Sequence, residues 1–322
     1  MARKTKIDDL MFPVELRPVY TNIELGGKTS QIKVPNSRVV VNKQSGKALG
    51  VVSTNYKLIT NQEAIEMGKK CCTELFGADE RSNIEIFKAY APSTGSYCHI
   101  DLVHKNYVMN LWNEKEPSNL YIPYVRVTNS YNTSRALRFD VGFCRKICLN
   151  GVIFEAETIK FTFSHIKHVF NQDITFAVEN GRMKKLFEEF SSYAKRLKSY
   201  EISRDNASKM IIALFKIKEE SEIDFRKKNE NLGDYEALLK HIKRKLNQYT
   251  EEIGENGYSL FNTITDIASH PIDNRYFRRD TNSLQRLAGN WINSFQNEIN
   301  GSGFNILEYI EALRNSEGKT RH

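Results

Sequence analysis

The sequence has no long apolar run. Its longest apolar stretches are short and broken by charge, as at 211–215 before Lys216, whereas a helix needs about 20 consecutive apolar residues to span a bilayer. The residues that follow Met1 also lack the apolar stretch of a secretion signal. We therefore expect a protein with no membrane span and a cytoplasmic location.

Cysteine is scarce and irregularly placed. The five residues Cys71, Cys72, Cys98, Cys144 and Cys148 are an odd number at irregular spacing, which does not suit a disulfide framework in a chain of this length. Reduced thiols fit better. The pairs Cys144/Cys148 and His165/His168 also lack the Cys-x-x-Cys spacing of structural zinc sites, so the sequence predicts no metal site and no cofactor.

A complete catalytic motif is missing as well. Gly27-Lys28-Thr29 resembles the end of a phosphate-binding loop, but Asn22 stands where that motif requires glycine. His99 and Asp101 share one face of a predicted strand and are a candidate acid–base pair, although solvent-facing pairs of this kind are more common. The sequence favours a protein that is not an enzyme, and we assign no catalytic residue.

Positive charge is abundant and unevenly distributed. The net charge is +8, and residues 181–250 hold 17 Lys and Arg against 11 Asp and Glu, an excess of six positive charges. Such an excess of positive charge on helices is typical of proteins that bind a phosphate backbone. A solvated helix face produces the same pattern, so both interpretations stay open.

The hydrophobic pattern predicts an α+β fold with an antiparallel sheet core and a helical carboxy-terminal half. We divide the chain into an amino-terminal arm (1–35) with one strand, a sheet-rich core domain (36–172) and a helical region packed on the core (173–322). Residues 38–41 and 49–52 flank a turn-rich link and predict a hairpin. Thr60 and Glu63 have capping-box spacing, which predicts a helix over 61–76 that stops at Gly77.

Residues 97–103, 136–141 and 159–164 alternate between apolar and polar side chains. This period of two predicts strands of an antiparallel sheet with one covered face. Pro123 lacks a backbone donor, so the strand around 120–128 should lie at an edge or begin after the proline.

The period changes to that of a helix after about residue 173. Apolar and aromatic residues form one stripe, with Lys184, Lys185, Lys195, Arg196 and Lys198 off it. The stripe comprises Met183, Leu186, Phe187, Phe190, Tyr193, Ala194, Leu197 and Tyr200. Further helices are predicted near 204–220, 234–253, 258–268, 282–299 and 304–314.

Several short stretches occur in a familiar order. They are Leu49–Ser53 with Tyr56–Ala64, then Val127–Tyr131, then Arg145–Gly151, and finally Leu260–His270. In this order they resemble a family of phage- and plasmid-encoded proteins known mainly as a domain of unknown function. The resemblance implies a mobile-element setting and a cytoplasmic location, and it brings no established activity.

The chain departs from that family at 131–134, where Tyr-Asn-Thr-Ser replaces a His-Asp-Gly-Ser-like turn. We therefore do not transfer to this chain any role that depends on the histidine of that turn. The order of a strand, a helix, antiparallel strands and a long basic helix is also similar to that of single-strand annealing proteins of the Rad52 type. This second similarity is one of architecture alone.

Cationic and polar side chains cluster around the motif-like stretches. Arg126 and Thr128 share a strand face, and Arg138 lies opposite the apolar side of its strand. Guanidinium groups on an open sheet face, with tyrosines for stacking, would suit a single strand, and the basic helices would add phosphate contacts. Ordinary surface arginines paired with nearby acids are the alternative. The predicted nucleic-acid-binding residues are Arg126, Thr128, Asn129, Arg135, Arg138, Arg145, Lys146, Lys243, Arg244 and Lys245.

Our leading hypothesis is a nucleic-acid-binding protein of a phage or plasmid that holds single-stranded DNA or RNA and acts as a single-strand annealing or recombination accessory. A metal-dependent or acid–base enzyme acting on nucleic acid or nucleotides, using His99, Asp101 or the region from Cys144 to His168, is the first alternative. A protein-interaction module that counters host functions is the second. The sequence does not decide whether the protein forms a homo-oligomer.

Overall fold

The computed structural model describes residues 3–76, 83–104, 106–112, 120–146, 150–153, 160–165, 182–218, 220–222, 224, 232–272 and 280–316. Gly77, where we predicted the end of a helix, lies outside these ranges. Cys148 and His168 of the metal alternative, and the basic residues 226–228, also lie outside them.

The chain forms two compact units, each built from three separate stretches. Unit 1 comprises Met1–Tyr107, Pro123–Gly142 and Thr158–Met183, and unit 2 comprises Val108–Ile122, Phe143–Glu157 and Lys184–His322. This division does not follow chain order, because the predicted regions 36–172 and 173–322 each contribute residues to both units.

The secondary structure confirms the α+β class: strands dominate the first half of the described chain and helices the second. The strands are β1 (Arg3–Lys4), β2 (Val14–Leu25), β3 (Lys28–Asn42), β4 (Ala48–Ser53), β5 (Ile84–Ala91), β6 (Tyr97–His104), β7 (Met109–Asn110), β8 (Leu120–Ser130), β9 (Leu137–Arg145), β10 (Gly151–Ile153) and β11 (Lys160–Phe163). The helices are α1 (Asn61–Phe76), α2 (Arg182–Ser199), α3 (Arg204–Leu214), α4 (Leu232–Ile253), α5 (Gly257–Ser269), α6 (Thr281–Glu298) and α7 (Ile306–Asn315), with short 3-10 turns at Asp8–Leu10 and Glu220–Glu222.

Within the described ranges, eight strands form one sheet in the order β1-β5-β6-β8-β9-β10, with β7 paired to β8 and β11 paired to β9. The pairings β5–β6, β6–β8, β7–β8 and β9–β11 are antiparallel, as the alternating pattern predicted. The prediction of a single covered face is wrong, because every residue of β6 from Cys98 to His104 is buried. Polar side chains on this strand find partners inside the protein.

Pro123 lies inside β8, which is a central strand between β6 and β9. The prediction of an edge strand, or of a strand that begins after the proline, is therefore wrong. On one side of β8 the partner changes at this position, because Tyr121 pairs with β7 and Tyr124 pairs with β6. Pro123 lies between the part of β8 that pairs with β7 and the part that pairs with β6. Its missing backbone N–H therefore interrupts neither of these two hydrogen-bond ladders.

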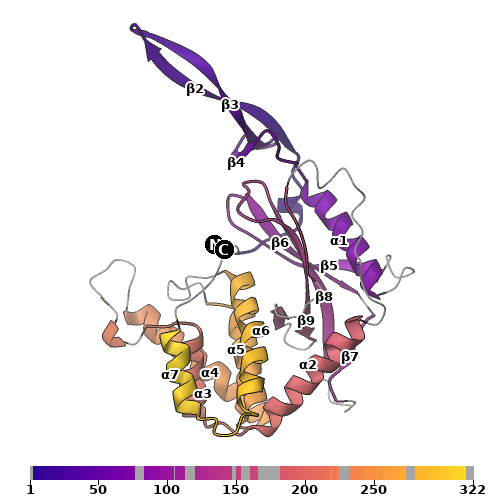
Figure 1. Ribbon diagram of the computed structural model, residues 1–322, viewed down its shortest axis with the longest axis vertical. Helices are drawn as coiled ribbons and strands as arrows, with labels where there is room; N and C mark the ends of the chain where they lie inside the picture. The colour runs from indigo at the N-terminus through magenta and orange to yellow at the C-terminus, as the bar shows by residue number, and fades with distance from the viewer. Residues whose placement is uncertain are drawn as a thin grey trace. The chain divides into compact units, whose positions relative to one another are not determined.

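Strands β2, β3 and β4 form a second, three-stranded antiparallel sheet in unit 1. The hairpin predicted around residues 42–47 is confirmed, since Val39 pairs with Val51. The arm before residue 35 contributes two long strands where we predicted one, and the β2–β3 ribbon extends well beyond the end of β4 (Figure 1). Both prolines of this ribbon stand at irregularities: Pro18 precedes a register shift on the edge strand β2, and Pro35 lies opposite it.

Helix α1 packs on the sheet of unit 1, and it begins at the predicted capping box. The backbone N–H of Thr60 donates to the carboxylate of Glu63 at 2.7 Å. The backbone N–H of Glu63 donates to the hydroxyl of Thr60 at 3.1 Å. The approach to the sheet is close at Gly68, where an added Cβ would overlap the side chains of Val127 and Leu102. Glycine at this position therefore lets the helix approach the strands.

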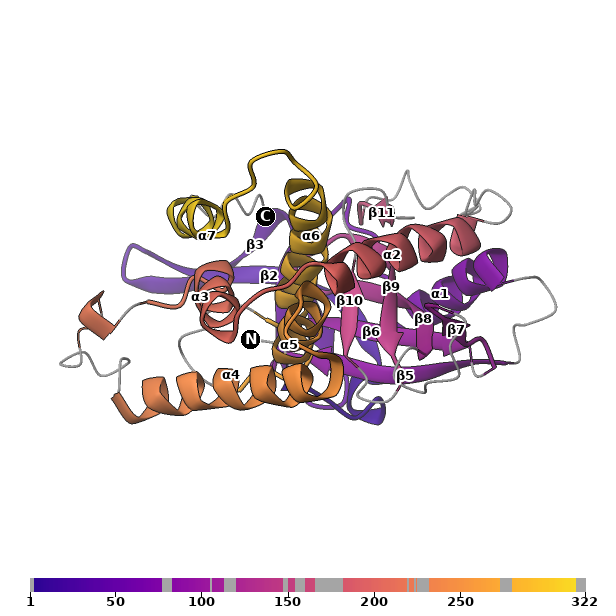
Figure 2. The same cartoon turned by 90° about the horizontal axis from the view of Figure 1, so that it is seen from below.

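Unit 2 is organised around α5. All of its residues from Gly257 to Ser269 are buried, and it packs against both α4 and α6 (Figure 2). The predicted stripe of α2 is confirmed, because Phe190 and Leu197 are buried and Phe190 contacts the rings of Tyr121 and Phe143. The polar outer side of α2 carries the predicted cations.

Candidate functional site

Arg126 does not lie on an open surface. Its side chain is 0% exposed, and its Nε and Nη2 atoms donate to the two carboxylate oxygens of Asp101 at 2.6 and 2.7 Å. Its guanidinium also lies over the rings of Tyr90 and Tyr124. Burial would lower the pKa of Arg126, but Asp101 raises it beyond its ordinary value. The predicted open arginine face is therefore wrong at this residue.

His99 and Asp101 do not form the acid–base pair considered from the sequence. Asp101 is engaged by Arg126, and Nδ1 of His99 lies 2.8 Å from the hydroxyl of Thr128. His99 and Thr128 are both buried. The polar face of β6 and β8 in this region thus consists of matched partners across two strands.

Asn129 joins two of the motif-like stretches. Its amide Nδ2 donates to the carbonyl of Ile59 at 3.0 Å and to Oδ1 of Asn61 at 2.9 Å. Tyr131 accepts from the backbone N–H of Asn61 at 3.0 Å, and Tyr56 donates to the carbonyl of Ser130 at 2.6 Å. The stretches 56–64 and 127–131 therefore hold one another in place in unit 1.

Arg135 and Arg138 are partly exposed, and each has a local partner. The Arg135 guanidinium lies 5.3 Å from the ring centroid of Tyr97. Nε of Arg138 lies 2.6 Å from the carboxylate of Asp140, and the Arg138 side chain is 21% exposed. Asp140 therefore offsets the charge of Arg138.

Arg145 is buried in unit 2, whereas its neighbour Lys146 is exposed. The side chain of Arg145 is 2% exposed, its Nη2 lies 2.6 Å from Glu252, and its guanidinium lies over the ring of Tyr249. The predicted open face is also wrong for Arg145, because its side chain is buried and pairs with Glu252, which itself lies partly exposed.

A polar cluster surrounds Asp266 in unit 2. Lys245 and Tyr249 each donate to Oδ2 at 2.8 Å, and Nδ1 of His270 lies 3.1 Å from Oδ1. Burial would raise the pKa of Asp266, but the bonds from His270, Lys245 and Tyr249 outweigh it and lower the pKa to about 2. Asn150 donates to Tyr249 at 2.7 Å, so the stretches 145–151 and 260–270 also meet.

The predicted basic triplet on α4 splits between two environments. Lys245 turns inward to Asp266, whereas Lys243 and Arg244 are exposed. Together with Lys240 they line an open groove of about 460 Å³. Its remaining lining consists of Asn247, Gln248 and Glu251. These positions recur at intervals of three and four residues, so they share one side of the helix. We call Lys240, Lys243 and Arg244 the α4 cationic surface.

A second groove, of about 530 Å³, lies in unit 2 between α2 and the segment that follows β7. It is lined by Trp112 on one side and by Lys184 and Lys195 on the other. The sequence identified the lysines as the outer side of a helix but gave no signal for Trp112, because the short strand before it has no periodicity.

A family model described as a domain of unknown function matches residues 48–291. The chain belongs to the DUF932 family. The matched region contains every one of the motif-like stretches, which confirms the resemblance to a domain of unknown function. It also contains the α4 cationic surface and Trp112, and it leaves the β2–β3 ribbon of the first 42 residues outside the DUF932 match.

Comparison of this DUF932 chain with curated proteins gives no match, and comparison with solved structures gives none either. No helix in the described part of the chain combines the length and the apolar character that crossing a bilayer requires. Within the same ranges, His, Cys, Asp and Glu side chains form no group of three that could hold a metal ion.

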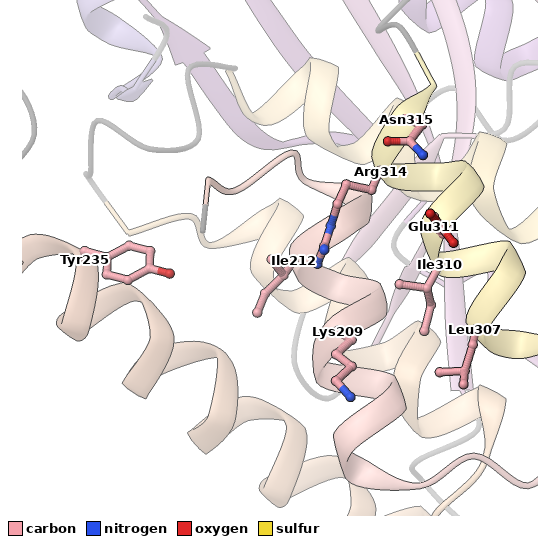
Figure 3. A pocket seen from close by; sticks show the side chains of 8 residues that line it. All are labelled: Lys209, Ile212, Tyr235, Leu307, Ile310, Glu311, Arg314 and Asn315. Atoms are coloured by element: carbon pink, nitrogen blue, oxygen red, sulfur yellow. The ribbon is translucent and has the colours of Figure 1, made fainter. Parts of the chain in front are cut away.

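A third groove of this DUF932 chain, of about 460 Å³, is lined by α3, α7 and Tyr235 of α4. Arg314 extends from α7 toward Ile212 of α3, and Glu311 lies nearby on the same helix (Figure 3). Apolar side chains line this groove beside two cations and one carboxylate, whereas the lining of the α4 groove is polar, with three cations and one carboxylate. The third groove is therefore less suited to a polyanion than the α4 cationic surface.

Proposed function

We propose that this DUF932 protein binds nucleic acid and that the α4 cationic surface contacts the phosphate backbone. The observation that carries the proposal is the excess of positive charge on this surface, where three cations share a groove with one carboxylate, that of Glu251. In the described chain no carboxylate pairs with Lys240, Lys243 or Arg244, whereas Arg126 and Arg145 are buried against acids. Exposed cations at regular spacing suit a chain of phosphates.

The preferred partner in this proposal is single-stranded DNA or RNA, held by its phosphates so that its bases stay free to pair. That arrangement suits a single-strand annealing or recombination accessory of a phage or plasmid, acting in the cytoplasm. The exposed cations of the α4 cationic surface support phosphate binding, and the annealing role extends the expectation drawn from the order of elements in the sequence. The sheet arginines Arg126 and Arg145 have a structural role in it, and the exposed Lys146 adds to the basic surface.

The test is a titration of labelled single strands, duplex DNA and RNA with the full chain, followed by fluorescence anisotropy. Affinity should fall steeply between about 50 and 200 mM salt, with a log–log slope of about −0.7 per single-strand phosphate contacted. The variant Lys243→Ala/Arg244→Ala should flatten the slope by about 1.4 if each residue contacts one phosphate.

The matched control is Arg204→Ala/Lys209→Ala, which removes the same charge from two cations of α3 that are already paired with Glu255 and Asp205. It should leave the salt slope nearly unchanged. Equal effects of the two variants would mean that net charge alone drives binding. If the wild-type protein binds no strand at low salt, the proposal fails and the protein-interaction module replaces it.

A second candidate, acid–base chemistry on the bound strand, is favoured by the dyad of His270 and Asp266. The carboxylate of Asp266 orients Nδ1 of His270, whose side chain is 47% exposed, and such a pairing directs the other ring nitrogen for proton transfer. Strand cleavage without added metal, abolished by His270→Gln, would support it. Intact strands after long incubation with the wild-type protein would exclude it.

A further inference from the structure

We infer that the groove between α2 and Trp112 is a subsite that stacks one unpaired nucleobase on the indole ring and holds the adjacent phosphate with lysines of α2. This inference rests on the proposed function and deepens it, because it assigns the side chains that give single strands their advantage over a duplex. We call Trp112, Lys195 and Lys198 the stacking subsite.

The groove has the size and the lining that a nucleotide requires. Its volume is about 530 Å³, and Phe187, Ser192 and Asn110 line it together with Trp112, Lys184 and Lys195. It therefore combines aromatic and aliphatic surface for a base with hydroxyl and ammonium groups for the sugar and phosphate. This mixture is characteristic of sites for single strands.

The indole ring is held in place before any ligand arrives. The rings of Trp112 and Tyr258 make a T-shaped contact with their centroids 5.0 Å apart, and the backbone N–H of Trp112 donates to Oδ1 of Asn110 at 3.1 Å. The hydroxyl of Ser191 donates to the carbonyl of Leu111 and so fixes the segment to α2. A ring that is ordered beforehand loses little conformational freedom when a base stacks on it.

One ammonium group lies over a face of the indole ring, and a second lines the same groove. Nζ of Lys198 lies 4.3 Å from the centroid of the indole, and Lys195 precedes it by one turn on the exposed side of α2. Helix α2 holds six Lys and Arg residues against the two glutamates Glu188 and Glu189. Glu188 lines the same groove, but Lys184 lies 3.9 Å from its carboxylate. Lys195 and Lys198 therefore supply the charge for a phosphate.

Such a subsite discriminates between single and double strands. In a duplex the bases are stacked on one another and paired, so they do not reach an indole ring in a groove. An unpaired base has a free face. The α4 cationic surface should bind both forms through phosphates, and the stacking subsite should give the single strand its advantage.

The test uses the full chain with Trp291→Phe, which leaves Trp112 as the one tryptophan of the sequence. Trp291 is buried against Phe295, so phenylalanine retains an aromatic ring there. Titration with oligothymidylate should quench the fluorescence of Trp112, whereas a duplex should bind with little quenching. Trp112→Ala should weaken oligothymidylate binding roughly 10-fold, as for other stacked aromatics, while Trp112→Phe retains most of the affinity.

Two further measurements keep the result interpretable. Lys195→Ala/Lys198→Ala changes exposed side chains only and should also weaken oligothymidylate binding, even if Trp112→Ala folds poorly. Binding that occurs without quenching, and that neither variant weakens beyond the effect of Arg204→Ala/Lys209→Ala, would overturn the subsite and leave the proposed function standing. Absence of binding to any strand would overturn both.

Discussion

Arg126 of β8 and Asp101 of β6 stand directly opposite each other in the sheet and form a two-point ion pair that is closed to solvent. Two aromatic rings flank the guanidinium, and the carboxylate side chain is 5% exposed. Because neither charge can be hydrated, each depends on the other. The pair therefore fixes the register of two central strands.

Replacing Arg126 by Ala should destabilise the protein by about 3 to 5 kcal/mol, because Asp101 would stay buried without its partner. Urea unfolding followed by circular dichroism measures this loss. Arg204→Ala is the control, since its pair with Glu255 is half exposed and should contribute less than about 1 kcal/mol. The double variant Arg126→Met/Asp101→Leu should lose less than the single variant. Equal losses from Arg126→Ala and Arg204→Ala would contradict the assignment.

Phe190→Ala should destabilise unit 2 by about 3 to 5 kcal/mol, as is usual for a buried aromatic ring. Phe190 contacts the rings of Tyr121, Phe143 and Phe261, and its removal would leave a cavity among them. The melting temperature provides the measurement. Leu307→Ala, at a side chain that is 57% exposed, should cause little change. A melting temperature unchanged by Phe190→Ala would refute the packing described for α2.

Asp266 should make stability depend on pH in the acid range. Its pKa in the folded state is about 2, below the ordinary 3.8, so its contribution is present above pH 4 and is lost as the pH falls toward 2. The shift corresponds to about 2 kcal/mol.

Asp266→Asn should therefore be less stable than the wild type at pH 7, and the difference should shrink between pH 4 and pH 2. Urea midpoints across this range measure it. Asp205→Asn, which removes an exposed ion pair with Lys209, is the matched control and should show almost no such trend. A constant difference between Asp266→Asn and the wild type across the range would be inconsistent with the lowered pKa.

Gly68→Ala should destabilise unit 1 although alanine favours helices by about 1 kcal/mol over glycine. The added methyl group would overlap Val127 and Leu102, and overpacking of this kind costs about 1 to 3 kcal/mol. Thermal unfolding shows whether the substitution lowers or raises the stability of the protein. Lys70→Ala, at an exposed position of the same helix, reports the effect of alanine without a clash. Stabilisation by Gly68→Ala would show that α1 does not approach the sheet so closely.

Much of the fold could be predicted because its signals are local. The capping box at Thr60 and Glu63, and the apolar stripe that contains Phe190, depend on residues a few positions apart. The β2–β3 ribbon was predicted only in part, because prolines that interrupt a strand in sequence are accommodated where the register shifts. That accommodation depends on pairing between distant residues.

The site could be predicted less well, for a related reason. The alternation of β6 and β8 shows which side chains share a face, but not whether that face is covered. Whether Arg126 meets Asp101, 25 positions earlier in the sequence, depends on the register of two strands. The exposed cations Lys243 and Arg244 were predictable because a helix places them by local geometry. Trp112 was not, because its environment comes from α2 and α5.

Each unit is assembled from three stretches of chain, and β8 and β9 each pass from one unit into the other. A single cut in the polypeptide therefore cannot release either unit whole. A truncated clone that ends near residue 107 or starts near residue 184 would lack strands that its unit needs. Gene fragments cannot be exchanged between relatives at one junction without dividing at least one of the units. A gene that encodes one complete unit therefore also encodes part of the other.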